Sequence, residues 1–133
     1  MTPELKALFD AARRAQAQAY APYSRFRVGA AIRSASGAIH AGCNVENAAY
    51  PVGACAEAGA LSAMVLAGDR QIAEILVIGD GPELCTPCGA CRQRLREFSA
   101  DAVLVHVAGP EGLRRSFTLG SLLPFSFGPD NLT

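Results

Sequence analysis

The sequence predicts an α/β sandwich built around a mixed β-sheet. Helix-like and strand-like segments follow one another along the chain in the order helix, strand pair, helix, strand, helix, strand, which is typical of this class. Half of the 133 residues are hydrophobic, enough for one domain with a buried core. No repeat, linker or low-complexity tract interrupts the chain, so we expect residues 1–133 to form a single domain.

The first third of the chain predicts one helix and a hairpin. Apolar residues recur at helical spacing over Pro3–Tyr20, where Pro3 suits the first turn of a helix. Two short apolar segments, Val28–Ile32 and Ile39–Cys43, flank the turn at Ser36-Gly37 and are expected to pair as strands.

The remaining elements alternate between helix and strand. A helix of small and apolar residues is expected over Cys55–Leu66, ending at Gly68. Ile75–Ile78 is a continuous apolar run, which favours a central strand buried on both faces. Pro87 opens a further helix that runs to about Phe98. Two strands and a short helix complete the prediction: Val103–Val107, Leu113–Phe117 and Leu119–Leu123.

Charge and composition limit the possible partners. Twelve Lys and Arg residues balance twelve Asp and Glu residues, which argues against a polynucleotide partner because phosphate backbones are bound mainly by Lys and Arg. An uncharged nucleoside is compatible with this balance. No apolar run is long enough to span a bilayer and no leader-like segment opens the chain, so we expect a soluble cytoplasmic protein without a membrane partner. The five cysteines then suggest thiols and metal ligands.

Three cysteines are candidate metal ligands. Cys88 and Cys91 have the Cys-x-x-Cys spacing that brings two thiolates to one ion, and Cys55 can supply a third. Soft thiolates favour zinc, and three protein ligands leave a fourth position open for water, as in catalytic zinc sites. Cys85 precedes Cys88 with the same spacing, so spacing alone leaves the choice of pair open.

Glu57 is the candidate catalytic residue. It lies two positions after Cys55, where its carboxylate can act as general base and then general acid for a water molecule on zinc. Each of the three candidate ligands lies near a predicted helix N-terminus, where backbone N–H groups and the positive end of the helix dipole favour thiolates. Such stabilisation is needed because three thiolates and one Zn²⁺ sum to a net charge of about −1.

A second polar pair is suited to a sugar. Asn44 and Glu46 are two residues apart in an extended segment, so both side chains face the same side. An amide and a carboxylate can together bind adjacent ribose hydroxyls. Phe26, just before the first strand, reads from its position as an aromatic residue at the edge of the core. Cys43, His40 and His106 are interpreted as structural.

Two functions other than hydrolysis fit part of this pattern. A structural zinc module would need a fourth ligand, for which Cys85 is the candidate, but it leaves Glu57, Asn44 and Glu46 without a role. A thiol redox protein could use Cys88 and Cys91, but the Cys55-x-Glu57 motif would then be unexplained.

The motifs together resemble the small homotetrameric zinc cytidine deaminases. They fall in the family's order and cover nearly the whole chain. The segments that carry the resemblance are Pro22–Ala31, Asn44–Ala48, Cys55-Ala56-Glu57, Pro87–Gln93, Leu122–Pro124 and Phe127–Pro129. The family pattern selects Cys88 and Cys91 over Cys85, because Pro87 immediately precedes Cys88.

The resemblance implies a three-layer sandwich with a mixed five-stranded sheet and one Zn²⁺ per chain. It implies deamination of cytidine or deoxycytidine to uridine or deoxyuridine in pyrimidine salvage, with a related aminonucleoside such as a nucleoside antibiotic as the alternative substrate. It implies a homotetramer in which Phe127 reaches the active site of a neighbouring subunit. The implied site consists of the ligands Cys55, Cys88 and Cys91, the catalytic Glu57, and the substrate contacts Phe26, Asn44, Glu46, Tyr50, Ala56 and Phe127.

The sequence departs from the family at one position. Many members carry an arginine directly after the glutamate of Cys-Ala-Glu, where it neutralises zinc-ligand sulfur, and this chain has Ala58 there. Arg92, next to Cys91, is a candidate replacement, and the sequence leaves open whether it takes that role. The Asn44 and Glu46 pair accommodates ribose or deoxyribose, since both sugars carry the 3′ hydroxyl.

Overall fold

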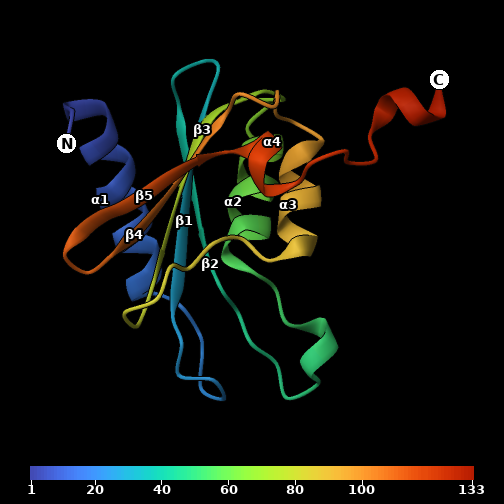
Figure 1. Cartoon of the computed structure of the whole chain (residues 1–133). Coiled ribbons are helices and arrows are strands. Elements are labelled where there is room, and N and C mark those ends of the chain that lie inside the picture. Colours follow the sequence, from blue (N-terminus) through green and yellow to red (C-terminus); the bar gives the residue numbers. More distant parts are fainter.

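Five strands form one mixed sheet in the order β2-β1-β3-β4-β5, in a computed structural model that describes residues 1–133 (Figure 1). The strands are β1 (Val28–Ser34), β2 (Ile39–Cys43), β3 (Ile72–Gly79), β4 (Leu104–Gly109) and β5 (Gly112–Thr118). The α-helices are α1 (Pro3–Ala17), α2 (Ala56–Leu66), α3 (Gly89–Arg96) and α4 (Leu119–Leu122), and two short 3₁₀ helices are η1 (Tyr50–Val52) and η2 (Pro129–Leu132).

The elements form the three layers that the sequence and the family resemblance predict. Helix α1 covers one face of the sheet, and α2 and α3 cover the other (Figure 1). One apolar cluster joins α1 to that face, with Leu8 and Phe9 packed near Leu76 and Ile78. A larger cluster joins the opposite face to α2 and α3, and includes Met64 and Leu95 among its buried residues. The predicted fold class is therefore confirmed.

Strand β3 lies at the centre of the sheet and is buried on both faces, as its apolar run predicts. Ile75 and Val77 face the α2 side, whereas Leu76 and Ile78 face the α1 side. Its pairing with β4 is parallel, and the other three strand pairs are antiparallel. The crossover between β3 and β4 contains α3. The segment between the end of β3 at Gly79 and the start of α3 at Gly89 contains Cys85 and Cys88.

Two boundaries differ from the prediction by three residues, and several others differ by one or two. Helix α1 ends at Ala17 instead of Tyr20, because Tyr20 pairs with the segment after β2: its N–H donates to Asn44 O at 3.0 Å, and its carbonyl accepts from Glu46 N at 2.8 Å. Strand β3 begins at Ile72 instead of Ile75 and includes Glu74. The carboxylate of Glu74 lies 3.1 Å from Arg33 Nε on the neighbouring strand, which satisfies its charge inside the sheet.

Both histidines have carboxylate partners distant in sequence. His106 Nε2 lies 3.0 Å from Glu74 Oε2, and its Nδ1 lies 2.7 Å from Ser116 Oγ. His40 Nε2 lies 3.0 Å from Asp69 Oδ2. These contacts join neighbouring elements away from the cysteines, in keeping with the structural interpretation of both residues. None of the helices has the length and apolar composition that crossing a membrane requires.

Candidate active site and metal centre

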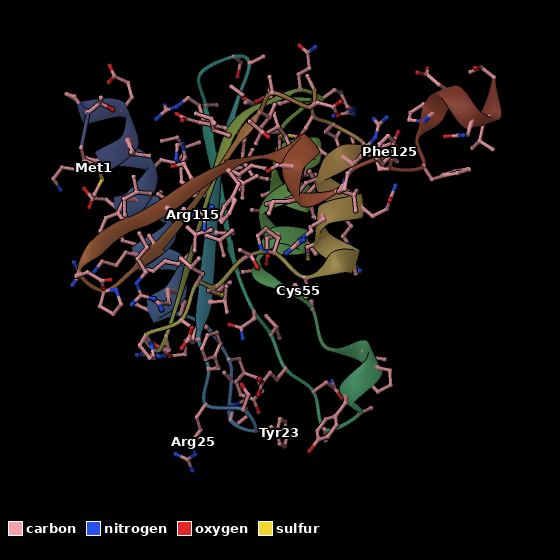
Figure 2. The ribbon with its side chains drawn as sticks, viewed as in Figure 1. Met1, Tyr23, Arg25, Cys55, Arg115 and Phe125 are labelled. Carbon is pink, nitrogen blue, oxygen red and sulfur yellow. The ribbon has the colours of Figure 1, made fainter.

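The sulfur atoms of Cys55, Cys88 and Cys91 gather at the N-terminal ends of α2 and α3. The three Sγ atoms all lie within 4.8 Å of one another. Tetrahedral zinc with Zn–S bonds of about 2.3 Å needs sulfur atoms about 3.8 Å apart, so the cluster fits a zinc ion with small adjustments. Figure 2 shows Cys55 at the end of α2 that lies next to the start of α3.

The backbone positions two of these cysteines as helix caps. Cys55 is the N-cap of α2 and Cys88 is the N-cap of α3, both in extended conformation, and Cys91 lies in the first turn of α3. The sulfurs therefore lie at helix N-termini, where the positive end of the helix dipole favours thiolates. A hydrogen bond from the Cys91 N–H lowers the pKa of the Cys88 thiol. Burial raises the pKa of Cys55 and of Cys91, so a bound cation would favour their thiolate forms.

Cys85 lies outside the sulfur cluster. It packs on the end of β3, where a Cβ added to Gly79 would come within 2.6 Å of its Sγ. Burial raises the pKa of its thiol to about 11, which disfavours the thiolate that a metal needs. The cluster therefore has three cysteine ligands, as in an open catalytic site.

Glu57 lies in the first turn of α2 and is only 6% exposed. Burial is the main cause of its raised pKa, which the charge of Arg94 opposes. A carboxyl group with a pKa nearer to neutral exchanges protons more readily with a reacting group, so this environment suits a general acid and base. Glu57, Cys55 and Cys88 all line the same cavity.

That cavity has a volume of about 340 Å³, which lies within the range of about 300–1,000 Å³ typical of small-molecule sites. Four predicted substrate contacts line it: Asn44, Glu46, Tyr50 and Ala56. Tyr50 is carried by η1 and stacks edge-to-face with Tyr23, with ring centroids 6.0 Å apart. The cavity is therefore lined by two thiols, by Glu57 and by further polar groups.

Asn44 and Glu46 make backbone contacts but keep capacity for a ligand. Asn44 accepts from Val28 N at 2.9 Å and donates to Phe26 O at 2.9 Å, which leaves one N–H and one lone pair free of these bonds. Glu46 Oε1 accepts from the N–H groups of Tyr23 and Ser24, at 2.9 and 3.1 Å, and Oε2 accepts from the Ser24 hydroxyl. A second acceptor position remains on Oε2.

Two predicted substrate contacts do not line the cavity in this chain. The Phe26 ring packs over the end of β3, where one ring carbon lies 3.2 Å from the place of a Cβ on Gly79. Phe127 is 58% exposed on the C-terminal tail, whose backbone is held to α3 by a 2.9 Å hydrogen bond from Gln93 to Phe127 O. The tail points away from the body of the molecule (Figure 1), and Phe125 lies well apart from Cys55 (Figure 2).

Sequence reasoning missed a cation at the sulfur cluster. Arg94 Nη1 lies 3.5 Å from Cys91 Sγ, whereas the guanidinium of Arg92 donates to Pro87 O, Leu122 O and Thr86 Oγ1. The signal was present, since residues three apart on a helix share a face and adjacent residues do not. The clamp of Tyr23 and Ser24 on Glu46 had no local signal, because it joins loops more than twenty residues apart.

The fold and the site together fit the class of metal-dependent hydrolytic enzymes, because a cluster of three cysteine sulfurs and a buried carboxylate meet at one small-molecule cavity. Residues 2–107 match the family model described as the cytidine and deoxycytidylate deaminase zinc-binding region. The chain is 37% identical over 130 residues to a cytidine deaminase of Sporosarcina psychrophila, covering 98% of this chain and 96% of that protein.

Solved structures agree with this match. The crystal structure of cytidine deaminase from Burkholderia pseudomallei superposes with a TM-score of 0.87 at 43% identity, covering 96% of this chain and all of that one. The cytidine deaminase from Mycobacterium tuberculosis gives a TM-score of 0.79 at 37% identity, with 92% and 96% covered. The chain therefore belongs to the cytidine and deoxycytidylate deaminase zinc-binding family.

Proposed function

We propose that this protein is a zinc-dependent cytidine deaminase that hydrolyses cytidine or deoxycytidine to uridine or deoxyuridine and ammonia. The observation that carries the proposal is the position of Glu57, buried beside three cysteine sulfurs on the wall of a nucleoside-sized cavity. The family match supports the same reaction. Pyrimidine salvage is the role that such a reaction serves.

The chain's own residues account for the proton movements. Cys55, Cys88 and Cys91 would hold the zinc ion, which would supply Lewis-acid activation of a water molecule. Glu57 accepts a proton from this water and donates it to N3 of the base, then takes the remaining proton from the new C4 hydroxyl and delivers it to the departing amino group. The water oxygen forms the new bond at C4, the C4–N4 bond breaks, and ammonia leaves. One carboxyl group can serve both steps because its raised pKa lets it gain and lose a proton readily.

The cavity offers donors and acceptors for the rest of the nucleoside. Ala56 is the first residue of α2, so its N–H has no partner within the helix and is available to the base carbonyl. Asn44 and Glu46 are placed to bind sugar hydroxyls with their remaining hydrogen-bonding capacity. Tyr50, which is 75% exposed on η1, lies at the edge of the cavity and can cover the sugar.

We further propose that the active unit is a homotetramer and that each subunit is one catalytic domain over residues 1–133. The support is the amount of exposed aromatic surface in the tail, where Phe125 is fully exposed and Phe127 is 58% exposed. In a tetramer Phe127 covers substrate in a neighbouring active site. The five free cysteines suit a reducing cytoplasm.

The test combines metal analysis with an absorbance assay on cytidine. The wild-type protein is expected to contain one zinc per chain and to convert cytidine to uridine. Glu57→Gln preserves volume and removes the titratable group, so it should keep zinc and fold while turnover falls by about 10²–10⁴-fold. A variant that keeps more than about a tenth of wild-type kcat would remove Glu57 from the mechanism. A preference for an aminonucleoside antibiotic over both cytidine and deoxycytidine would change the substrate assignment.

A further inference from the structure

We propose that Arg94 supplies the positive charge that balances the three-thiolate zinc site, and that it acts as a positioning residue through the Sγ atom of Cys91. The proposal rests on the zinc-dependent function proposed above. It assigns to α3 the role that family members commonly give to an arginine in the helix that follows the first cysteine, where this chain has Ala58.

The net charge of the site creates the need for such a residue. Three thiolates and one Zn²⁺ carry a net charge of about −1, which weakens the activation of water by the metal. Helix N-termini offset part of this charge, each with about half an elementary charge. A guanidinium N–H that donates to a thiolate withdraws electron density from sulfur and so leaves the metal more electrophilic.

Arg94 alone among the cationic side chains donates to one of the three sulfurs. Its Nη1 lies 3.5 Å from Cys91 Sγ, and the guanidinium has no other hydrogen bond in the structure. Arg92, which is nearer in sequence, is held by Pro87 O at 2.7 Å and Leu122 O at 2.9 Å, so its guanidinium fixes the backbone that leads into α3. The two arginines on one helix therefore have separate tasks.

Helical spacing places Arg94 beside Cys91. Cys91 is buried, and Arg94 follows it by three residues on α3, so the guanidinium reaches the cluster from its solvent side. Arg94 is thus the arginine of α3 that donates to a candidate metal ligand, whereas the hydrogen bonds of Arg92 go to Pro87 O, Leu122 O and Thr86 Oγ1.

The decisive experiment removes the charge at Arg94 and restores it from the other helix. Arg94→Gln in the zinc-loaded enzyme is expected to lower kcat by about tenfold to a hundredfold with little change in KM, as for loss of one charge-assisted hydrogen bond. Arg94→Lys should recover part of the loss. Adding Ala58→Arg to Arg94→Gln should recover most of it, because the new guanidinium starts from the first turn of α2 beside Cys55.

Two metal measurements separate this role from a structural one. Zinc content should stay at one per chain in Arg94→Gln, and zinc transfer to a chromogenic chelator should be no faster than in the wild type, because the sulfurs become more electron-rich. In the Co²⁺-substituted protein, the sulfur-to-cobalt absorption band should shift in Arg94→Gln and return in the Ala58→Arg double variant. The control Arg13→Gln removes an exposed positive charge from α1, on the other face of the sheet, and should change none of these measurements.

Several results would overturn the proposal. Unchanged kcat in Arg94→Gln, or faster zinc loss, would overturn the proposal, as would failure of Ala58→Arg to restore either activity or the cobalt spectrum. If the wild-type protein binds zinc and does not deaminate cytidine, the proposed function fails, and the cobalt spectra of the variants still test the contact between Arg94 and the metal ligands.

Discussion

Gly42 on β2 and Ala56 on α2 touch backbone to backbone. A Cβ at Gly42 would lie 2.6 Å from the carbonyl oxygen of Ala56, and it would also meet the backbone of Ala60 one turn later. Helix α2 can therefore rest directly on β2 without a side chain between them. Because Ala56 follows Cys55, this contact fixes the distance of Cys55 from the sheet.

Gly42→Ala should displace α2 and with it the first ligand. Overpacking of this kind costs about 1–3 kcal/mol, so we expect the free energy of unfolding to fall by that amount and zinc release to a chelator to become faster. Gly59→Ala is the matched control, because a Cβ at Gly59 would make only an ordinary contact of 3.5 Å with Gly42. Urea unfolding of both variants checks the prediction, and equal stabilities would contradict it.

Replacement of single cysteines should identify the ligands. Cys88→Ala or Cys91→Ala should lose zinc and much stability, because each removes one of three sulfurs; structural zinc sites contribute about 10–16 kcal/mol of apparent binding free energy. Cys85→Ala should keep one zinc per chain, since its Sγ lies outside the cluster. Metal analysis after gel filtration decides between these outcomes, and loss of zinc in Cys85→Ala would reverse the assignment.

Glu46→Gln should weaken the binding of nucleosides. Loss of a charge-assisted hydrogen bond to a sugar hydroxyl predicts a fall in kcat/KM for cytidine of about tenfold to a hundredfold, while free cytosine remains a poor substrate for both proteins. Glu46 also holds the Tyr23-Ser24 loop, so Ser24→Ala serves as the control that loosens the loop and keeps the carboxylate. Equal activity on cytidine and on cytosine would end the sugar-binding assignment.

Phe127→Ala should raise KM more than it affects zinc content, because the proposed tetramer places this ring over substrate in a neighbouring subunit. Truncation before Leu122 should weaken assembly and activity together. Leu132→Ala, which also lies on the exposed tail, is the control. Light scattering at assay concentrations, combined with kinetics, tests the proposal, and a fully active monomer would rule it out.

In the Asp69→Asn variant, the free energy of unfolding should fall less on acidification than it does in the wild type. Hydrogen bonds from Ser34, His40 and Ser36 hold the pKa of Asp69 below its ordinary value of 3.8. Between the folded and unfolded pKa values the unfolded chain binds more protons, so this stabilisation is complete above pH 3.8 and is lost as the pH falls through the folded value. The stability difference between the two proteins should therefore shrink on acidification.

Urea unfolding at about pH 6 and about pH 3 measures that difference, and the zinc site, being common to both proteins, largely cancels. Asp10→Asn is the control, because it removes an exposed carboxylate whose partner is Lys6 alone. A difference that stays constant across this range would contradict the assignment.

The sequence predicted the features that depend on local pattern. Apolar runs and turn residues predicted all five strands, and the bounds expected for the second strand, Ile39–Cys43, are those of β2. The start of β3 was missed because Glu74 interrupts the apolar pattern. Its carboxylate is accommodated in the strand by Arg33 and His106, which lie on neighbouring strands. The two 3₁₀ helices, η1 and η2, carry no periodic signal and were not predicted.

In the candidate site too, features set by local spacing were predicted and contacts between distant segments were not. Cysteine spacing gave the candidate sulfurs of the cluster, and the family pattern was needed to choose Cys88 and Cys91 over Cys85. The position of Glu57, two residues after Cys55, predicted that it lines the same cavity. Contacts between loops had no such signal: the position of Phe26 over Gly79 and the clamp on Glu46 depend on how separate segments meet. Arg94 was overlooked in favour of Arg92 because nearness in sequence was preferred to helical spacing.

Because the candidate ligands lie at the starts of two helices, a metal ion bound by them would join two distant parts of the chain reversibly. An ion that joins Cys55 to Cys88 closes a loop of about 34 residues that contains the whole of α2 and β3. By the chain-entropy relation that applies to disulfides, closing a loop of that length reduces the entropy of the unfolded chain by an amount worth roughly 4 kcal/mol at 25 °C. In a reducing compartment, zinc can thus constrain the unfolded chain as a covalent bridge does elsewhere, and a chelator can reverse the constraint.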